Sequence, residues 1–543
     1  MIVEGSRVND LRFKEDDEPI PDPSIKFTDL KTVPEESEIN LAKFIKLTFA
    51  TSMNQYKYPD TADLAEEEEN QVQKEADTIP VILTVETHEP GFLQGHLPRV
   101  PIDLLCVVDK SGSMLFDEKM TQLKKTLKNL LKFLIPDDRL CLIEYDSKAK
   151  RLTNLRCVNE QNIEYFEEVI SGIQASGGTS ICDGLLIAKH VIDKRRQKNR
   201  VCSIFLLSDG DDPAGLKGME HLLQVFQKQY NSEVSINTFG FGEDCNEDLL
   251  SVIADRCNGL FYFIETEEDL NDMFCDCLGR MVSVLGKNAK IRVQLKPTKA
   301  FPEIAFHRTY GKDWSGDSEI IREVDLGYII AGSVKTFVFK VKLPPNKYFD
   351  GEDDFPLDLT IVEAGLTSES FLAKEESNLK LPFQTSTSLT LTLVDCIDPT
   401  LEPDEEVEVQ VLRVETAEAQ TEMYEMVKQK KRVQASQLHD QWMKKLAKNS
   451  KISNHPVYQG CLRNMADMSE YIQSTQNPGV KKAAAKRANL RRQKKNMLNI
   501  RNQMMCSSSG NWAVYANKRQ QEFQQKMKAI SKRQIGGTEE QDD

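Results

Sequence analysis

The stretch Leu104-Leu-Cys-Val-Val-Asp-Lys-Ser-Gly-Ser-Met114 joins an apolar run to a polar loop. The apolar run carries no charge, which is typical of a parallel strand that is covered on both faces. The loop then presents a carboxylate at Asp109 and hydroxyls at Ser111 and Ser113, before helix-forming sequence begins at about residue 119. In open α/β sheets, ligands bind at the edge where the parallel strands end. The stretch therefore predicts both a fold and the place of a functional site.

The same alternation of strand and helix patterns extends from about residue 100 to about residue 285. Short apolar or β-branched runs alternate with longer amphipathic ones, as in parallel strands joined by crossover helices. We therefore expect an α/β fold with a doubly wound, mostly parallel sheet. The expected strands are 102–108, 140–145, 151–155, 202–207, 234–239 and 260–264, and the expected helices lie near 117–134, 161–172, 180–195, 216–230, 245–256 and 266–284.

The rest of the chain changes character several times, as expected for 543 residues, which are too many for one core. Residues 1–78 are acidic and are expected to be largely disordered, apart from a short helix or strand at 39–50. Residues 79–99 should contribute one or more strands to a β-sandwich formed mainly by 287–400. Helix formers dominate the region that follows. The expected segments are thus 1–78, 79–99, the α/β domain at 100–286, the sandwich at 287–400, a basic helical region at 401–534 and a disordered tail at 535–543.

Charge is distributed unevenly along the chain. Seventy Lys and Arg against 85 Asp and Glu give a net charge of −15, but residues 428–534 hold 24 Lys and Arg against 4 Asp and Glu, or +20. The remainder therefore carries −35. We expect this basic segment to contact an acidic surface, either on a partner or on the same chain. Nucleic acid is a less favoured ligand, because charge alone carries no sequence information.

The location of the protein is predicted from its N-terminus and its cysteines. The first residues lack the apolar core of a secretory signal, and no run approaches the roughly 20 apolar residues of a membrane span. The twelve cysteines are scattered singly and are expected to be reduced. We expect no membrane association and a cytoplasmic location, with the nucleus as an alternative.

Two later loops are expected at the same sheet edge as the loop after the first strand. Gly177-Gly178-Thr179-Ser180 opens a predicted helix, and Ser208-Asp209-Gly210 closes a predicted buried strand. Alone, the Asp-Lys-Ser-Gly-Ser segment also fits an ordinary turn. Together, the three loops offer two carboxylates and three hydroxyls, a donor set that suits Mg²⁺ or Mn²⁺. The candidate metal ligands are Asp109, Ser111, Ser113, Thr179 and Asp209.

These residues, in this order, resemble the D-x-S-x-S…T…D pattern of the von Willebrand factor type A (vWA) domain and its metal-ion-dependent adhesion site (MIDAS). The resemblance covers about residues 100–285. It implies that Asp109, Ser111 and Ser113 contact the cation, while Thr179 and Asp209 do so directly or through water. It also implies that an acidic side chain of a protein partner completes the coordination.

The order of a vWA domain followed by β-rich and helical regions is similar to an intracellular branch of the family found in plant RING-type ubiquitin ligases and in protist proteins. This chain has no C-x-x-C…C-x-x-C zinc pattern, so ligase activity is not expected.

We expect a non-enzymatic interaction or scaffold protein. Ser111 and Ser113 do not lie in a G-x-S-x-G motif, and none of the seven histidines falls in a recognisable triad motif. One alternative is a magnesium-dependent phosphohydrolase, but such an enzyme usually carries a second Asp at the position where Ser111 stands. The other alternative is nucleic-acid binding through residues 428–534.

Overall fold

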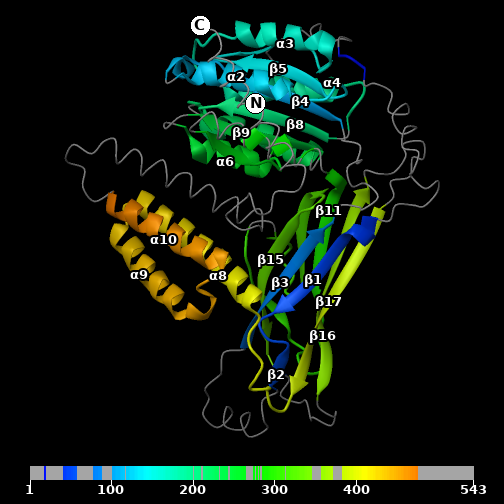
Figure 1. Ribbon diagram of the computed structural model, residues 1–543, viewed down its shortest axis with the longest axis vertical. Coiled ribbons are helices and arrows are strands. Elements are labelled where there is room, and N and C mark those ends of the chain that lie inside the picture. Colours follow the sequence, from blue (N-terminus) through cyan, green and yellow to red (C-terminus); the bar gives the residue numbers. More distant parts are fainter. Residues whose placement is uncertain are drawn as a thin grey trace, which may run out of the picture. The chain divides into compact units, whose positions relative to one another are not determined.

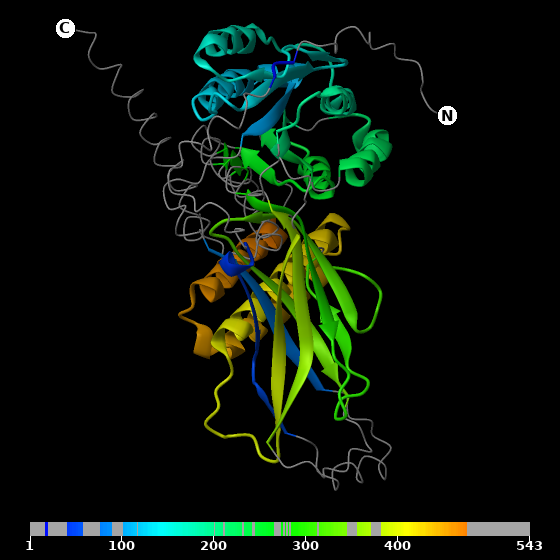
Figure 2. The same ribbon diagram turned by 90° about the vertical axis from the view of Figure 1, so that its right-hand side faces the viewer.

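The computed structural model divides into two compact units (Figures 1 and 2). The first, the α/β unit, comprises residues 1–38, 90–287 and 516–543, and the second, the sandwich unit, comprises 39–89 and 288–515. Within them the structure describes residues 17–19, 41–57, 77–88, 101–116, 118–199, 201–209, 212–230, 233–241, 245–264, 273–274, 277–278, 281, 284–311, 314–344, 356–370 and 382–474.

The α/β unit is built on a seven-stranded sheet of order β10-β9-β8-β4-β5-β6, with β7 also paired to β5. Strand β4 lies inside the sheet, parallel to both β5 and β8, and all eight of its residues are buried. The expected mostly parallel sheet is confirmed. Its strands are β4 (Ile102–Asp109), β5 (Arg139–Tyr145), β6 (Ala149–Arg151), β7 (Arg156–Cys157), β8 (Val201–Ser208), β9 (Val234–Phe241) and β10 (Phe261–Ile264).

Helices lie on both sides of this sheet in Figure 2, as a doubly wound fold requires. Several begin at a polar side chain that accepts a hydrogen bond from an amide of the first turn. Asn159, Ser180 and Asn246 act in this way for α3, α4 and α6. The helices are η6 (Gly112–Leu115), α2 (Lys119–Leu131), α3 (Glu160–Gly172), α4 (Ile181–Lys194), α5 (Gly215–Val225), η7 (Phe226–Tyr230) and α6 (Glu247–Arg256).

Two expected elements of this unit differ from the structure. The strand expected at 151–155 is wrong, because β6 ends at Arg151 and β7 begins at Arg156. Between them the chain turns, and the amides of Leu152 and Thr153 both donate to the Leu142 carbonyl. The helix expected at 266–284 falls largely outside the described residues, and its last position already belongs to a strand that starts at Val284.

The sandwich unit contains two sheets, of order β1-β3-β15-β12 and β13-β14-β11-β16-β17-β2. Strand β3 pairs with β15 from Asp77 to Glu86, which joins segments about 250 residues apart in the chain. The strands are β1 (Ile45–Thr51), β2 (Gln55–Lys57), β3 (Asp77–Thr87), β11 (Val284–Leu295), β12 (Ala305–Thr309), β13 (Trp314–Ser315), β14 (Ile321–Ile330), β15 (Val334–Leu343), β16 (Leu357–Ser370) and β17 (Pro382–Val394).

Residues 1–78, expected to be largely disordered apart from a short helix or strand at 39–50, contribute strands to the sandwich. Strands β1 and β2 both lie within this segment, and β3 starts at Asp77 rather than Ile79. Ile45 and Leu47 alternate inward and are buried, while the ring of Phe49 meets that of Phe339 edge-on at 6.4 Å. The apolar residues of β1 are therefore part of the sandwich core, and the sandwich begins well before residue 79.

Three helices of the expected helical region follow the sandwich: α8 (Glu405–Lys428), α9 (Arg432–Lys448) and α10 (Pro456–Ser474), with a short η8 (Ser450–Ile452). They share a core that includes Met423, Leu446 and Met465. Residues 475–543, which hold most of the basic segment and the expected tail, lie outside the described residues. No helix in the described part of the chain is long and apolar enough to cross a membrane.

Glu415 on α8 connects three elements of the sandwich unit. Its Oε1 accepts hydrogen bonds from Lys340 Nζ of β15 and from the Tyr310 hydroxyl, both at 2.8 Å, and its Oε2 accepts one from Lys445 Nζ of α9 at 2.6 Å. Burial alone would raise the pKa of Glu415, but the bonds from Lys340, Lys445 and Tyr310 lower it to about 2. The ionised carboxylate therefore stabilises the packing of the helices on the sheet.

The first prediction concerns acid stability. A carboxylate with a lowered folded pKa stabilises the folded state fully above its ordinary pKa of 4.5, and this stabilisation is lost as the pH falls toward 2. Glu415→Gln should lower the free energy of unfolding by about 1–3 kcal/mol at pH 7. It should also flatten the loss of stability between pH 5 and pH 2.

Urea unfolding followed by tryptophan fluorescence measures both effects, because Trp314 and Trp442 lie in this unit. The control is Glu422→Gln, which changes an exposed carboxylate on the same helix. Equal pH profiles for Glu415→Gln and the wild type would contradict the stabilising role of Glu415.

Candidate metal-binding site

Asp109 is the last residue of β4, and its side chain is fully buried. Its Oδ1 accepts a hydrogen bond from the Ser111 amide at 2.8 Å. Its Oδ2 accepts one from Ser208 Oγ at 2.7 Å and one from the Tyr145 hydroxyl at 3.2 Å. These donors hold the carboxylate in one orientation at the end of the strand, but all of them are neutral.

The buried environment raises the pKa of Asp109 to about 6. Loss of hydration is the main cause, the negative charge of Asp209 adds to it, and the hydrogen bonds from Ser111 and Ser208 oppose it. Two carboxylates are thus close enough to repel each other in a poorly hydrated place. A bound cation would relieve this repulsion.

Ser111 and Ser113 lie in the loop that follows β4, where their hydroxyl oxygens are 2.9 Å apart. Gly112 between them donates its amide to the Gly177 carbonyl at 3.0 Å. A Cβ atom at position 112 would lie only 3.3 Å from that carbonyl, so glycine permits the close approach of the two loops. The Ser176 amide also donates to the Lys110 carbonyl. Two backbone hydrogen bonds therefore hold the loop after β4 against the loop that precedes α4.

Thr179 is half-buried and lies between Gly177 and the start of α4. Two residues later, the Ile181 amide donates to Asp212 Oδ2 at 2.8 Å. Asp212 follows β8, so this bond draws the loop that carries Thr179 toward the loop that carries Asp209. All three predicted loops therefore meet at the carboxyl edge of the sheet, as expected for parallel strands.

Asp209 provides an unsatisfied polar atom at this edge. The residue is only 3% exposed, and its Oδ1 is buried with no hydrogen-bond partner among the described residues. Its Oδ2 lies 3.5 Å from Lys119 Nζ, on a side chain that is also buried. Buried polar atoms are nearly always paired in folded proteins, so an unpaired Oδ1 at this edge suits a ligand that binds oxygen.

The donor set at this edge depends on hydroxyl groups. Among the described residues, no three His, Cys, Asp or Glu side chains cluster closely enough to hold a metal ion. Two carboxylates assisted by hydroxyls suit a hard, partly hydrated cation better than a tightly caged one. The residues present therefore fit Mg²⁺ or Mn²⁺ bound with water.

Sequence reasoning missed three residues of this edge: Tyr145, Ser208 and Lys119. Tyr145 lies opposite Asp109 in the register of β5 on β4, and Ser208 is the last residue of β8. Strand alignment would have found both, because they end neighbouring strands. No sequence signal marked Lys119, since a lysine at the start of a helix is ordinary on a surface.

Comparison with known proteins identifies the family of the α/β domain. Residues 104–211 match the family model described as the von Willebrand factor type A domain. The chain contains a vWA domain. The match ends two residues after Asp209 and so includes the three loops of the site.

Two curated proteins and one solved structure are similar to this chain. Uncharacterized protein sll0103 from Synechocystis is 31% identical over 202 residues, which is 37% of this chain and 47% of that protein. E3 ubiquitin-protein ligase WAVH1 from Arabidopsis thaliana is 33% identical over 145 residues, 24% of this chain and 21% of that protein. The chain thus spans less than half the length of these relatives.

The solved structure titled "von Willebrand factor type A from Catenulispora acidiphila" has a TM-score of 0.52. It covers 82% of this chain and 94% of its own at 14% sequence identity. At this identity the similarity shows the fold alone.

The second prediction tests the hydrogen bonds of Asp109. Ser208→Ala removes the 2.7 Å bond to a fully buried carboxylate and should destabilise the vWA domain by about 1–3 kcal/mol in chelator-treated protein. The shift of the domain's unfolding midpoint in urea measures this loss. Ser171→Ala, which changes an exposed serine of the same domain, should leave the midpoint unchanged. Equal midpoints for the two variants would show that the Ser208 bond contributes nothing.

Proposed function

We propose that the chain is a metal-dependent protein-interaction or scaffold protein and not an enzyme. Asp109, Ser111, Ser113, Thr179 and Asp209 form a MIDAS that binds Mg²⁺, or Mn²⁺ in its place. The observation that carries the proposal is the buried Oδ1 of Asp209, which has no partner among the described residues although a second buried carboxylate lies nearby. A divalent cation would satisfy that oxygen and neutralise both charges.

The cation would serve recognition. Magnesium prefers oxygen ligands in octahedral geometry and retains waters when a protein offers few ligands. An acidic side chain of a protein partner can replace one of these waters. The charge of the metal then favours a carboxylate, while the surrounding loops select its shape and context.

Two exposed apolar side chains extend this surface. Leu115 and Phe116, just after Ser113, are 66% and 68% exposed. Large apolar side chains at the surface are enriched in the centre of protein interfaces. Their position beside the candidate site supports a protein partner rather than a small anion.

Catalysis is the weaker alternative. The hydroxyls of Ser111 and Ser113 contact each other, and Ser111 also bonds Asp109. Among the described residues, neither hydroxyl is hydrogen-bonded to a histidine that could activate it as a nucleophile. A phosphohydrolase would need a carboxylate where Ser111 stands. Ligase activity belongs to WAVH1 as a whole protein, of which this chain matches 21%. Nucleic-acid binding through 428–534 rests on residues that are mostly not described.

We also propose a cytoplasmic location, with the nucleus as the alternative. The cysteines in the described part of the chain are free thiols, as a reducing compartment favours, and most of them are buried.

The third prediction tests metal and partner binding with the same variants. Asp109→Ala should abolish Mg²⁺ binding, because it removes the carboxylate fixed in the loop with both serines. Asp209→Ala should weaken Mg²⁺ binding less. Thr179→Ala should weaken partner capture more than cation binding. Calorimetric titration measures the Mg²⁺ affinity of each variant. Affinity capture followed by elution with chelator measures partner binding.

A matched variant distinguishes the contribution of the metal to partner binding from that of the exposed apolar side chains. Leu115→Ser with Phe116→Ser leaves all five candidate ligands intact, so it should bind Mg²⁺ normally while capturing less partner. Partner capture that persists in chelator for every variant would show that recognition does not pass through the metal.

The fourth prediction concerns Lys119, whose ammonium lies 3.5 Å from Asp209 Oδ2. A positive charge beside a metal ligand opposes a dication, and two unit charges about 4 Å apart near a protein surface interact by about 4 kcal/mol. Lys119→Met should therefore raise Mg²⁺ affinity by at least about tenfold. Calorimetry measures this, with Lys125→Met, an exposed lysine on the same helix, as the control. Unchanged or weaker binding would mean that Lys119 does not oppose the cation.

A further inference from the structure

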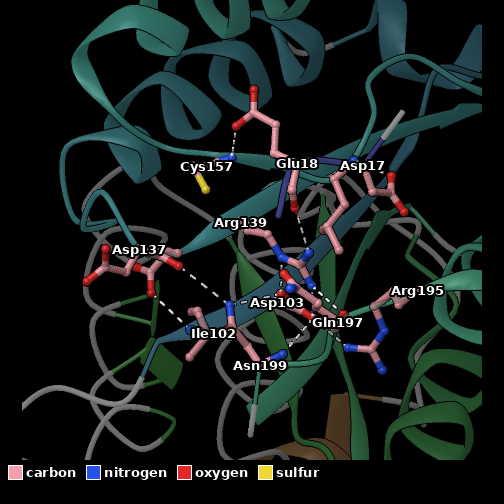
Figure 3. A network of polar contacts seen from close by, with 12 residues as sticks. Asp17, Glu18, Ile102, Asp103, Asp137, Arg139, Cys157, Arg195, Gln197 and Asn199 are labelled. Carbon is pink, nitrogen blue, oxygen red and sulfur yellow. Dashed lines mark hydrogen bonds and ion pairs between the residues drawn. The ribbon is translucent and has the colours of Figure 1, made fainter. Parts of the chain in front are cut away.

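Asp17-Glu18-Pro19 lies against the vWA domain at β5 and β7, more than 100 residues away in sequence (Figure 3). The Glu18 amide donates to the Leu155 carbonyl at 3.0 Å. The Glu18 carbonyl accepts a hydrogen bond from Arg139 Nη1 at 2.9 Å. The backbone of this short segment is therefore held at its amide by a main-chain carbonyl and at its carbonyl by the Arg139 side chain.

The two carboxylates of the segment are each held by a backbone amide and a side chain. Glu18 accepts hydrogen bonds from the Cys157 amide at 2.8 Å and from Asn162 Nδ2 at 3.1 Å. Asp17 Oδ1 accepts one from the Leu155 amide at 3.0 Å and pairs with Arg151. Hydrogen bonds to ionised acceptors are stronger than neutral ones, so the contacts specify two adjacent acidic residues.

The domain positions these donors by its own contacts. Arg139 is 1% exposed, and its Nε and Nη2 donate to the two oxygens of Asp103, each at 2.8 Å. Arg195 also donates to Asp103, at 2.6 Å. Nη1 of Arg139 is left to bond Glu18, and Asn162 Nδ2 is fixed by the Cys157 carbonyl at 3.0 Å. Figure 3 shows Asp103, Arg139, Arg195 and Asn199 converging beneath the segment. The site is thus preorganised, which lowers the entropy cost of binding.

This site is distinct from the candidate MIDAS. Asp103 is near the beginning of β4, whereas Asp109 ends it. Six residues of strand separate the two by roughly 20 Å. A ligand at one site does not touch the other.

We propose that this edge of the vWA domain is a binding site for an extended acidic peptide with an adjacent Asp-Glu pair, and that Asp17-Glu18-Pro19 is its tethered occupant. A partner peptide of the same chemistry binds by displacing this segment. The occupant is small and held mainly by polar contacts, so it can exchange with a competitor. Its tether keeps it at an effective concentration up to about the millimolar range, which makes the site selective for tight or multivalent partners.

The test uses the full chain and a fluorescently labelled peptide of residues 13–23. Asp17→Ala with Glu18→Ala removes the carboxylates of the tethered occupant and should free the site. The released variant should bind the peptide saturably, at least about tenfold more tightly than the wild type, in fluorescence polarisation. Chelator should leave this binding unchanged, which separates it from the proposed MIDAS.

Two further variants, made in the released chain, show where the peptide binds. Arg151→Ala should weaken peptide binding, whereas Lys150→Ala should not, because Lys150 is the exposed neighbour of Arg151 on the same strand. A peptide with Ala at both acidic positions should not bind. Equal peptide binding by wild-type and released chains would overturn the proposal, as would no binding by a released chain that melts like the wild type.

Cysteine reactivity gives an independent readout without added peptide. Cys157 is 5% exposed, its Sγ faces the Pro19 carbonyl, and burial followed by the charge of Glu18 raises the pKa of its thiol to about 11. Alkylation mapped by mass spectrometry should be faster at Cys157 in the released variant and slow again with excess peptide. Unchanged reactivity would contradict displacement. A wild-type dimer that dissociates in the released variant would instead assign the occupant to a second copy and overturn tethering within one chain.

Discussion

Strand β4 buries a carboxylate near each of its ends, and the way each charge is compensated organises the vWA domain around it. Isolated buried carboxylates are strongly unfavourable unless they are paired. Near the start of the strand, Asp103 has two arginines, Arg139 and Arg195. At its end, the donors to Asp109 among the described residues are Ser111, Ser208 and Tyr145, all of them neutral. The carboxylate at one end is therefore neutralised by the protein's own arginines, and the carboxylate at the other end is the one for which we propose a cation.

This asymmetry explains why the two ends act differently. The paired end holds a peptide of the same chain through donors that Asp103 has already fixed. At the other end, Asp209 Oδ1 has no partner among the described residues, and Lys119 Nζ lies 3.5 Å from Oδ2. Ion pairing fixes the side chains at the first end, and the incomplete pairing at the second end is what supports the proposed cation site.

Much of the vWA fold could be predicted from the sequence, because its buried strands are short apolar runs and its helices are longer amphipathic ones. Asp109, Ser111 and Ser113 were found because they follow one such run within a few residues. Lys119 and the Asp17-Glu18 pair were not found, because no local sequence pattern indicates which distant segment lies beside them. The segment at 39–50 was expected as either a helix or a strand, because the choice depends on its pairing with β3, which lies about 40 residues further along the chain. All five predicted ligands lie at the expected edge, but the metal contacts of all five stay predictions.

The pairing of β3 with β15 also sets an order of events during synthesis. Thr87, at the end of β3, bonds Ser333, so the whole vWA domain is made between two halves of one sheet. At about 5–20 residues per second, the ribosome needs roughly 12–50 seconds to deliver β15 after β3 has emerged. During that interval the vWA domain can fold on its own, while β3 waits with an open edge. All residues of the inserted domain are therefore made before the sandwich can close, which happens only after more than half of the protein has been synthesised.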